Sequence, residues 1–432
     1  MTATRRGWLG QPCAPGGERR ATGRRAAIPS PTLPMAAGRQ ANWSINSSES
    51  ARSEAGAASL SLPATYKKLV AARAGASFRD VAKVTTLSVD DLVGSLESDE
   101  VIVRVAYAGV NGGCETFRCR GEHAFARNRS LTDFPLGAEG VGTVVAVGSD
   151  GASDGASDGG TNGIDVHTPV MFVGGAFSEY VKLKTSACSP VPSASAGYAA
   201  LRISGHVAYA ALTYNASIQP DDIVLVTAGA GATGSFAVQV AKRRGAHVVA
   251  TCRNTAKAEM LRRLGVDRVI EYSREDVREV FEREYCHRVD VAYEGVGGSL
   301  LEAAWDLALK DGGRLLSVGY ISQYPHNDED VVKTERRRHE ALELPPSESL
   351  FWKAMTLDVG GKTFVGNVWP DAADLRQRAL EEAVAMVEHG ELECIVDPRR
   401  FSGVEAAVEA VEYMLSGQAL GKVVLSFVDM TE

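Results

Sequence analysis

Cysteine pairs spaced as Cys-x-x-Cys are absent, although the 432 residues include seven cysteines. The cysteines are odd in number and scattered along the chain. This usage is typical of free thiols in a reducing compartment rather than of a disulfide framework. It also leaves no four-cysteine lobe that could hold a structural zinc.

Long uncharged apolar runs are scarce as well. The longest run near the middle of the chain, residues 223–241, contains a glycine-rich centre and Gln239. These residues make it a poor lipid-facing helix, so we expect no membrane span.

Positive charge is scarce outside the first 60 residues. The formal net charge is −8, to which residues 1–60 contribute +5 through eight arginines against three acids. The remainder therefore carries −13, which argues against nucleic acid as the main partner because that role needs a basic surface. The Arg-rich, acid-poor leader is typical of a mitochondrial or plastid transit peptide. The alternative is a disordered N-terminus without an address, in which case we expect a cytoplasmic protein.

The sequence pattern changes near residue 205. Before it, β-branched strands are expected at residues 101–110, 142–147 and 170–181, with a flexible Gly-Ala-Ser-Asp loop at 149–160. After it, short apolar strands alternate with helical segments, which predicts βαβ units on a parallel sheet buried on both faces. A helix at 375–389 and a strand at 422–427 indicate a return to the first domain. We expect a disordered leader over 1–62, a β-rich domain over 63–200 plus 370–432, and a nucleotide-binding domain over 201–369.

A glycine-rich segment follows the first of these apolar strands. Gly229-x-Gly231-x-x-Gly234 comes directly after a strand, opens a helix and precedes a second strand. In this context the glycines allow a sharp turn and close approach to a pyrophosphate, and the helix N-terminus favours the anion. The segment including Ala232 and Thr233 is therefore predicted to bind a dinucleotide.

The end of the second strand decides between the nicotinamide cofactors. An acid usually accepts from the ribose 2′-OH in NAD enzymes, but this position reads Thr-Cys-Arg-Asn and has no acid. Arg253 and the nearby Lys257 would attract a 2′-phosphate. The cofactor is therefore predicted to be NADPH.

Several segments resemble the medium-chain dehydrogenase/reductase superfamily, and within it the zinc-free quinone-oxidoreductase and prostaglandin-reductase branch. The resemblance covers roughly residues 66–428. The matching segments are GVN (109–111), FPLGAEGVGTVVAVG (134–148), GAFSEY (175–180), VTAGAGATG (226–234), LGVDRVIEY (264–272), DVAYEGVGG (290–298), GYISQY (319–324) and ALGKVVL (419–425).

The resemblance implies an α/β fold. A GroES-like, β-rich catalytic domain would be formed from both ends of the folded region, and a Rossmann domain with a doubly wound parallel sheet would be inserted between them. Because members of the family are often dimers, it also implies a homodimer.

Zinc-dependent relatives place a Cys where this chain has Asn111 and a His where it has Ala138. Since a catalytic zinc needs three protein ligands, the resemblance implies a site without metal. Alcohol oxidation would then lack its Lewis acid, whereas reduction of an activated C=C bond needs only hydrogen-bond donors for the developing enolate oxygen. The expected substrate is a small unsaturated carbonyl compound or a quinone.

Residue roles also follow from the resemblance. Tyr324 matches a tyrosine that can donate to the enolate oxygen, and Asn111 would hold the nicotinamide ribose or the substrate oxygen. The other cofactor contacts implied are Lys257 and Tyr272 at the 2′-phosphate, with Arg253 in place of a family Ser, and Gly295, Ile321, Tyr324 and Phe364 at the nicotinamide half. The polar segment 322–350 is expected to be a lid.

Two alternatives remain open. If the leader directs the protein to an organelle, a 2-enoyl-thioester reductase is the alternative enzymatic function. The fold is also reused in non-catalytic, crystallin-like proteins that bind NADPH.

Overall fold

The computed structural model describes residues 62–75, 77–119, 132–148, 164–323, 342, 355–366 and 372–428. Residues 62–432 belong to one compact unit. Residues 1–61 of the leader, the loop at 149–160 and all but three residues of the expected lid lie outside the described residues.

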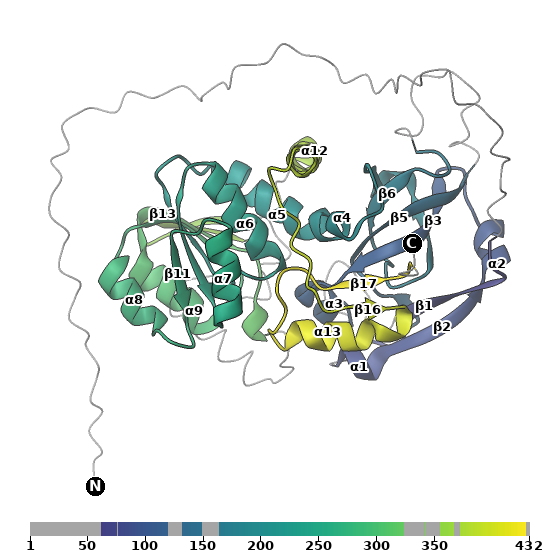
Figure 1. The fold of residues 1–432 in the computed structure, drawn as a ribbon, viewed down its shortest axis with the longest axis horizontal. Coiled ribbons are helices and arrows are strands. Elements are labelled where there is room, and N and C mark those ends of the chain that lie inside the picture. The colour runs from purple at the N-terminus through teal and green to yellow at the C-terminus, as the bar shows by residue number, and fades with distance from the viewer. Residues whose placement is uncertain are drawn as a thin grey trace, which may run out of the picture. The chain divides into compact units, whose positions relative to one another are not determined.

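The β-rich half is built from two sheets whose neighbouring strands are antiparallel, except for the parallel pair β16 and β17 (Figure 1). A small sheet has the order β2-β1-β4, and a larger one has the order β16-β17-β3-β5-β6-β8, with β7 also paired to β3. The expected strand at 101–110 is β3, and the expected strand at 170–181 is divided into β6 and β7. Their bounds are β1 Thr65–Ala71, β2 Ala82–Ser88, β3 Glu100–Gly109, β4 Phe134–Pro135, β5 Glu139–Val147, β6 Pro169–Val173, β7 Tyr180–Lys184, β8 Cys188–Pro190, β16 Phe401–Ser402 and β17 Val424–Ser426.

The other half contains a seven-stranded sheet with the order β11-β10-β9-β12-β13-β15-β14. All neighbours are parallel except β14 and β15. The first six strands follow the 3-2-1-4-5-6 order of a Rossmann fold, so the expected doubly wound sheet is confirmed. The bounds are β9 Ile223–Val226, β10 His247–Cys252, β11 Arg268–Glu271, β12 Val289–Glu294, β13 Leu309–Ser317, β14 Met355–Val359 and β15 Lys362–Gly366.

Helices cover the sheets and connect them. A continuous helical stretch over residues 196–215 crosses between the halves, because α4 packs on β3 and β5 while α5 packs on α6 and α12. The helices are α1 Phe78–Val81, α2 Val89–Gly94, α3 Gly112–Cys119, α4 Ala196–Ala200, α5 His206–Ala210, α6 Ala232–Arg243, α7 Thr255–Arg263, α8 Val277–Glu284, α9 Gly298–Ala303, α12 Ala373–Glu388 and α13 Ala407–Leu415. The 3₁₀ and π segments are η2 Thr185–Ala187, η3 Leu201–Gly205, η4 Ala211–Asn215, η5 Ala304–Ala308, η6 Ile321–Gln323 and η7 Val404–Ala406.

The C-terminal segment, yellow in Figure 1, returns to the β-rich half after α12. It passes the glycine-rich loop, where the Gly421 amide donates to the Ala230 carbonyl oxygen at 2.9 Å, and ends in β17 against β3. Gly421 has φ +75°, and a Cβ there would meet the Ile395 carbonyl oxygen at 2.4 Å. Glycine is therefore required where residue 421 approaches the Ile395 backbone within the C-terminal segment.

In the part of the chain that the structure describes, no helix is long and apolar enough to cross a bilayer. Five of the six described cysteines are free thiols.

Candidate dinucleotide and substrate site

A cavity of about 1090 Å³ opens at the carboxyl ends of β9 and β12, where the strand order reverses. Ligands of open α/β sheets bind at such switch points. Its walls come from both halves: the glycine-rich loop and the ends of β10 to β13 on one side, and residues 110–114 and 414–423 on the other. The volume is at the upper end of the roughly 300–1,000 Å³ usual for small-molecule sites, which suits a dinucleotide together with a substrate.

Glycine is favoured at each of the three positions of the loop for a different local reason. A Cβ at Gly229 would meet the Ala250 Cβ at 2.9 Å, and one at Gly234 would meet the Ala228 carbonyl oxygen at 2.5 Å, so both positions serve packing. At Gly231 the nearest protein atom to a Cβ lies at 3.3 Å. Gly231 lines the cavity and Gly229 does not, so the contact of Gly229 with the cofactor stays a prediction. The absent side chain at Gly231 leaves room for a ligand rather than for protein.

Helix α6 begins directly behind this opening. Its N-cap is Gly231, without a side chain to occupy the first free N–H groups, and Ala232, Thr233 and Gly234 line the cavity. The unpaired amides and the helix dipole favour an anion at this point. The loop therefore fits a pyrophosphate.

Two cations lie at the end of β10. Arg253 directly follows the strand, and Lys257 lies in the first turn of α7, which the Asn254 side chain caps by accepting from the Lys257 amide at 3.1 Å. Both cations line the cavity. Arg253 Nη1 donates to the Ser416 carbonyl oxygen at 3.0 Å, and Lys257 Nζ donates to that of Gly417 at 2.7 Å.

Burial, followed by the nearby Arg253 charge, lowers the pKa of Lys257. A bound phosphate would oppose both effects, because an adjacent negative charge favours the charged ammonium. The carbonyl oxygens at the end of α13 provide a weaker counterpart, since cations are favoured at a helix C-terminus. Hydrogen bonds to backbone carbonyl oxygens thus hold Arg253 and Lys257 at the cavity wall, where both cations can bind a phosphate group.

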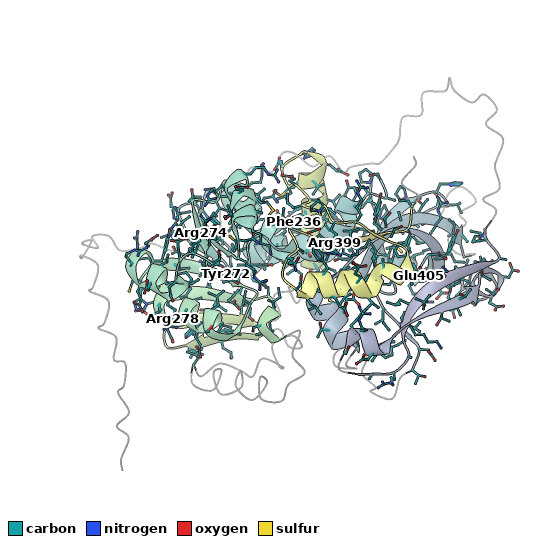
Figure 2. The ribbon with its side chains drawn as sticks, turned by 60° about the horizontal axis from the view of Figure 1, so that its bottom comes forward. Phe236, Tyr272, Arg274, Arg278, Arg399 and Glu405 are labelled. Carbon is teal, nitrogen blue, oxygen red and sulfur yellow. The ribbon has the colours of Figure 1, made fainter. Side chains whose placement is uncertain are left out.

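Tyr272 follows β11 and lines the same end of the cavity with 46% of its surface exposed. An exposed tyrosine at a strand end is available for stacking against a flat ring. Arg278 also lines this end and was not expected from the sequence. Figure 2 shows both residues on the nucleotide-binding half, away from Arg399 and Glu405.

The opposite end is shaped by a buried carboxylate at the end of β12. Glu294 Oε1 accepts from the Thr227 hydroxyl at 3.1 Å and from the Val296 and Gly297 amides at 2.8 and 3.1 Å. These bonds fix the turn after β12. They place Gly295 on the cavity wall, where Ile321 also lies with 48% of its surface exposed.

Asn111 follows β3 and lines the cavity from the β-rich half. Its side chain is bonded to Glu139 and Lys422, both of which are fully buried. Tyr324, the other expected catalytic residue, lies outside the described residues and stays a prediction.

Phe364 is not at the site, which corrects the expectation for the nicotinamide half. It is fully buried in β15, outside the cavity lining, with its ring 6.2 Å from that of Trp305 in an edge arrangement. Its strand pairs with β13 and directs the ring into the core beneath α9 and η5. An apolar residue of a parallel strand faces such a core rather than a ligand.

The sequence reasoning also missed α13, whose C-terminal carbonyls contact the two cations. A signal was present, because Val404, Ala407 and Val411 are fully buried and recur at helical spacing. The buried Glu139 and Lys422 beside Asn111 were missed too. No local pattern joins them, since they are 283 positions apart.

Within the described ranges, no three His, Cys, Asp or Glu side chains gather so that they could hold a metal ion. A site without metal remains a prediction of the sequence.

Comparisons with known proteins agree with this geometry. The family model for the alcohol dehydrogenase GroES-like domain matches residues 97–193, and that for zinc-binding dehydrogenase matches residues 232–340. Prostaglandin reductase-3 of Bos taurus is 32% identical over 371 residues, covering 84% of this chain and 90% of the relative. A probable quinone oxidoreductase of Leishmania amazonensis is 30% identical over 371 residues, covering 85% and 99%.

The crystal structure of Escherichia coli quinone oxidoreductase in complex with NADPH is similar in fold, with a TM-score of 0.62 at 21% identity over 84% of this chain and all of that chain. The chain belongs to the medium-chain dehydrogenase/reductase superfamily and is an oxidoreductase. Within that superfamily it is similar to the quinone-oxidoreductase and prostaglandin-reductase branch, as the sequence motifs predict.

Proposed function

We propose that the chain is an NADPH-dependent reductase that saturates the C=C bond of α,β-unsaturated ketones or reduces quinones without a metal. The observation that carries the proposal is the placement of Arg253 and Lys257 beside the open face of Gly231, in one cavity with Asn111. This arrangement fits a dinucleotide with a 2′-phosphate at one end and leaves a polar wall at the other.

The protein groups divide the work. Arg253, Lys257 and Tyr272 hold the adenosine end, and the N-terminus of α6 holds the pyrophosphate. NADPH, when bound, supplies the hydride. Donors of the cavity wall would orient the carbonyl oxygen of the substrate, so that its C=C bond could take up the hydride at the β-carbon and a proton from solvent at the α-carbon. Hydrogen-bond donors at the cavity wall lower the energy of the developing oxyanion.

Purified protein without residues 1–62 tests this function by its consumption of NADPH with simple enones, quinones and enoyl thioesters. We expect enones or quinones to be reduced faster than thioesters, and NADPH to be preferred over NADH. Faster reduction of enoyl thioesters would favour a 2-enoyl-thioester reductase. Tight NADPH binding without turnover of any member would favour a non-catalytic binding protein.

Native mass spectrometry of the same preparation tests the metal-free site. We expect no zinc at the mass of the folded chain. One tightly held zinc per chain would overturn that part of the proposal.

A further inference from the structure

A fully buried ion pair lies behind the cavity wall. Lys422 Nζ and Glu139 Oε1 are in contact, and neither side chain has any exposed surface. Replacing such a pair by neutral groups of similar size is often neutral or stabilising, because desolvation offsets the attraction. Stability alone therefore does not explain the pair.

The ion pair is completed by residues of the cavity wall. Lys422 Nζ also donates to Asn111 Oδ1 at 2.8 Å and to Ser204 Oγ at 3.3 Å. These contacts and the ion pair supply acceptors for all three ammonium hydrogens. Glu139 Oε1 accepts from Asn111 Nδ2 at 2.6 Å, and Oε2 accepts from the Ile203 amide at 2.6 Å.

This network fixes which way the Asn111 amide points. An ammonium group can only donate and a carboxylate can only accept, so Oδ1 must face Lys422 and Nδ2 must face Glu139. Among the described residues, the other acceptor bonded to Nδ2 is the Gly109 carbonyl oxygen, at 3.5 Å, a distance at which a hydrogen bond is weak. The Asn111 Nδ2 group therefore keeps a weakly bonded hydrogen that can be donated toward the cavity that Asn111 lines.

Ser204 is oriented by the same ammonium group. Its hydroxyl oxygen accepts from Lys422, which directs its own hydrogen away from that nitrogen. Within the described residues this is the one hydrogen bond of its side chain, and Ser204 lines the cavity. Asn111 Oδ1 and Ser204 Oγ thus both lie within 3.3 Å of one buried ammonium group, and both residues line the cavity.

We propose that Glu139 and Lys422 are positioning residues that present Asn111 and Ser204 as paired donors to the carbonyl oxygen of the substrate. The pair would stabilise the oxyanion that develops as the C=C electrons shift, while the two buried charges keep the donors from rotating. Preorganised donors in a site that excludes water are effective because they need not reorient during the reaction. This inference rests on the proposed function.

Two variants test the proposal. Ser204→Ala removes one donor. The double variant Glu139→Gln with Lys422→Met removes both charges at similar volume and frees the Asn111 amide to turn. Lys362→Met is the control, because Lys362 is a half-buried lysine that donates to the Trp305 carbonyl oxygen within the fold but lies outside the cavity lining.

For each variant, thermal unfolding, NADPH binding by fluorescence, and kcat and KM with an enone are measured. We expect kcat to fall about tenfold or more in both test variants, by analogy with the loss of one oxyanion-hole donor. The unfolding midpoint, the Kd for NADPH and KM should stay close to wild type, as should all values of the control. Unchanged kcat in both test variants would overturn the proposal. A fall in kcat that is fully explained by weaker NADPH binding or by a lower unfolding midpoint would also overturn it. The network would then serve the cofactor or the structure.

Binding of 4-nitrophenolate to the complex with NADP⁺ separates this inference from the proposed function. The probe carries an oxyanion, and its absorbance band reports hydrogen bonding without turnover. If the wild type reduces no carbonyl compound, the proposed function fails. Weaker probe binding in both test variants than in wild type would still support the donors, and equal or absent binding in all proteins would overturn them.

Discussion

Lys257 of α7 donates to the carbonyl oxygen of Gly417, at the end of α13, over 2.7 Å. The bond joins a nucleotide-binding helix to the segment that leads back into the β-rich half. The same ammonium group lines the cavity where a 2′-phosphate is expected.

The variant Lys257→Met should therefore distinguish the two nicotinamide cofactors. We expect the Kd for NADPH to rise about tenfold to a hundredfold, because hydrogen bonds to charged groups contribute about 1.5–3 kcal/mol, while the Kd for NADH changes little. Fluorescence titration with both cofactors measures this. Lys242→Met, which removes a surface lysine paired with Asp267 at 2.7 Å, is the control. An equal loss for both cofactors would contradict a phosphate-binding role.

Two glycines of the loop should respond in opposite ways. Gly231→Val places a side chain in the open cavity, at φ −81° and ψ 177°, which other residues adopt without strain. It should abolish NADPH binding and leave stability nearly unchanged. Gly234→Ala should instead lower the free energy of unfolding by about 1–3 kcal/mol, because its Cβ meets the Ala228 carbonyl oxygen. Urea unfolding together with NADPH titration tests both, and a stable Gly231→Val that still binds NADPH would argue against the pyrophosphate position.

Two variants with opposite expected effects test the finding that Phe364 lies in the core and not at the site. Phe364→Ala should lower the free energy of unfolding by about 3–5 kcal/mol, as for other buried aromatic truncations, without a change in NADPH affinity. Tyr272→Ala, at an exposed position, should weaken NADPH binding with little loss of stability. Reduced NADPH affinity of folded Phe364→Ala would restore the expectation from the family.

The stability of the protein should depend on His206 under mildly acidic conditions. Its ring is buried in α5, where Nε2–H donates to the Arg376 carbonyl oxygen at 2.7 Å, and burial lowers its pKa to about 4. Between about pH 6.5 and about pH 4 the unfolded chain binds a proton that the folded chain does not. The free energy of unfolding should therefore fall by about 3 kcal/mol as the pH falls through this window.

Urea unfolding across this pH range measures the effect. In His206→Gln, which lacks the titrating ring, this contribution should disappear, although the variant is expected to be less stable at neutral pH. An unchanged pH dependence in that variant would show that other groups control acid stability.

Local patterns were sufficient for most of the fold. The run of β-branched residues predicted β3, the apolar run predicted β9, and Gly231 with its neighbours predicted the turn into α6. These elements follow from periodicity and from the conformational freedom of glycine, both of which are properties of short segments.

The missed parts of the site depend on contacts between distant segments. The local sequence indicates only that Lys422 is a charged residue before a terminal strand and that Glu139 belongs to a glycine-rich strand. Only the folded chain brings their charges together and removes water from both. Phe364 was misplaced for a related reason, since a family motif matched only roughly cannot fix the register of a strand.

The bond from Gly421 to Ala230 has a consequence for the order in which the protein is made. Chain growth releases the glycine-rich loop long before residues 419–426, so the loop first folds without its main-chain partner from the C-terminal segment. Lys422 reaches Glu139 and Asn111 in the same late step. A growing chain can thus form the parallel sheet early, but the cavity wall formed by residues 419–423 is added only after that sheet has left the ribosome.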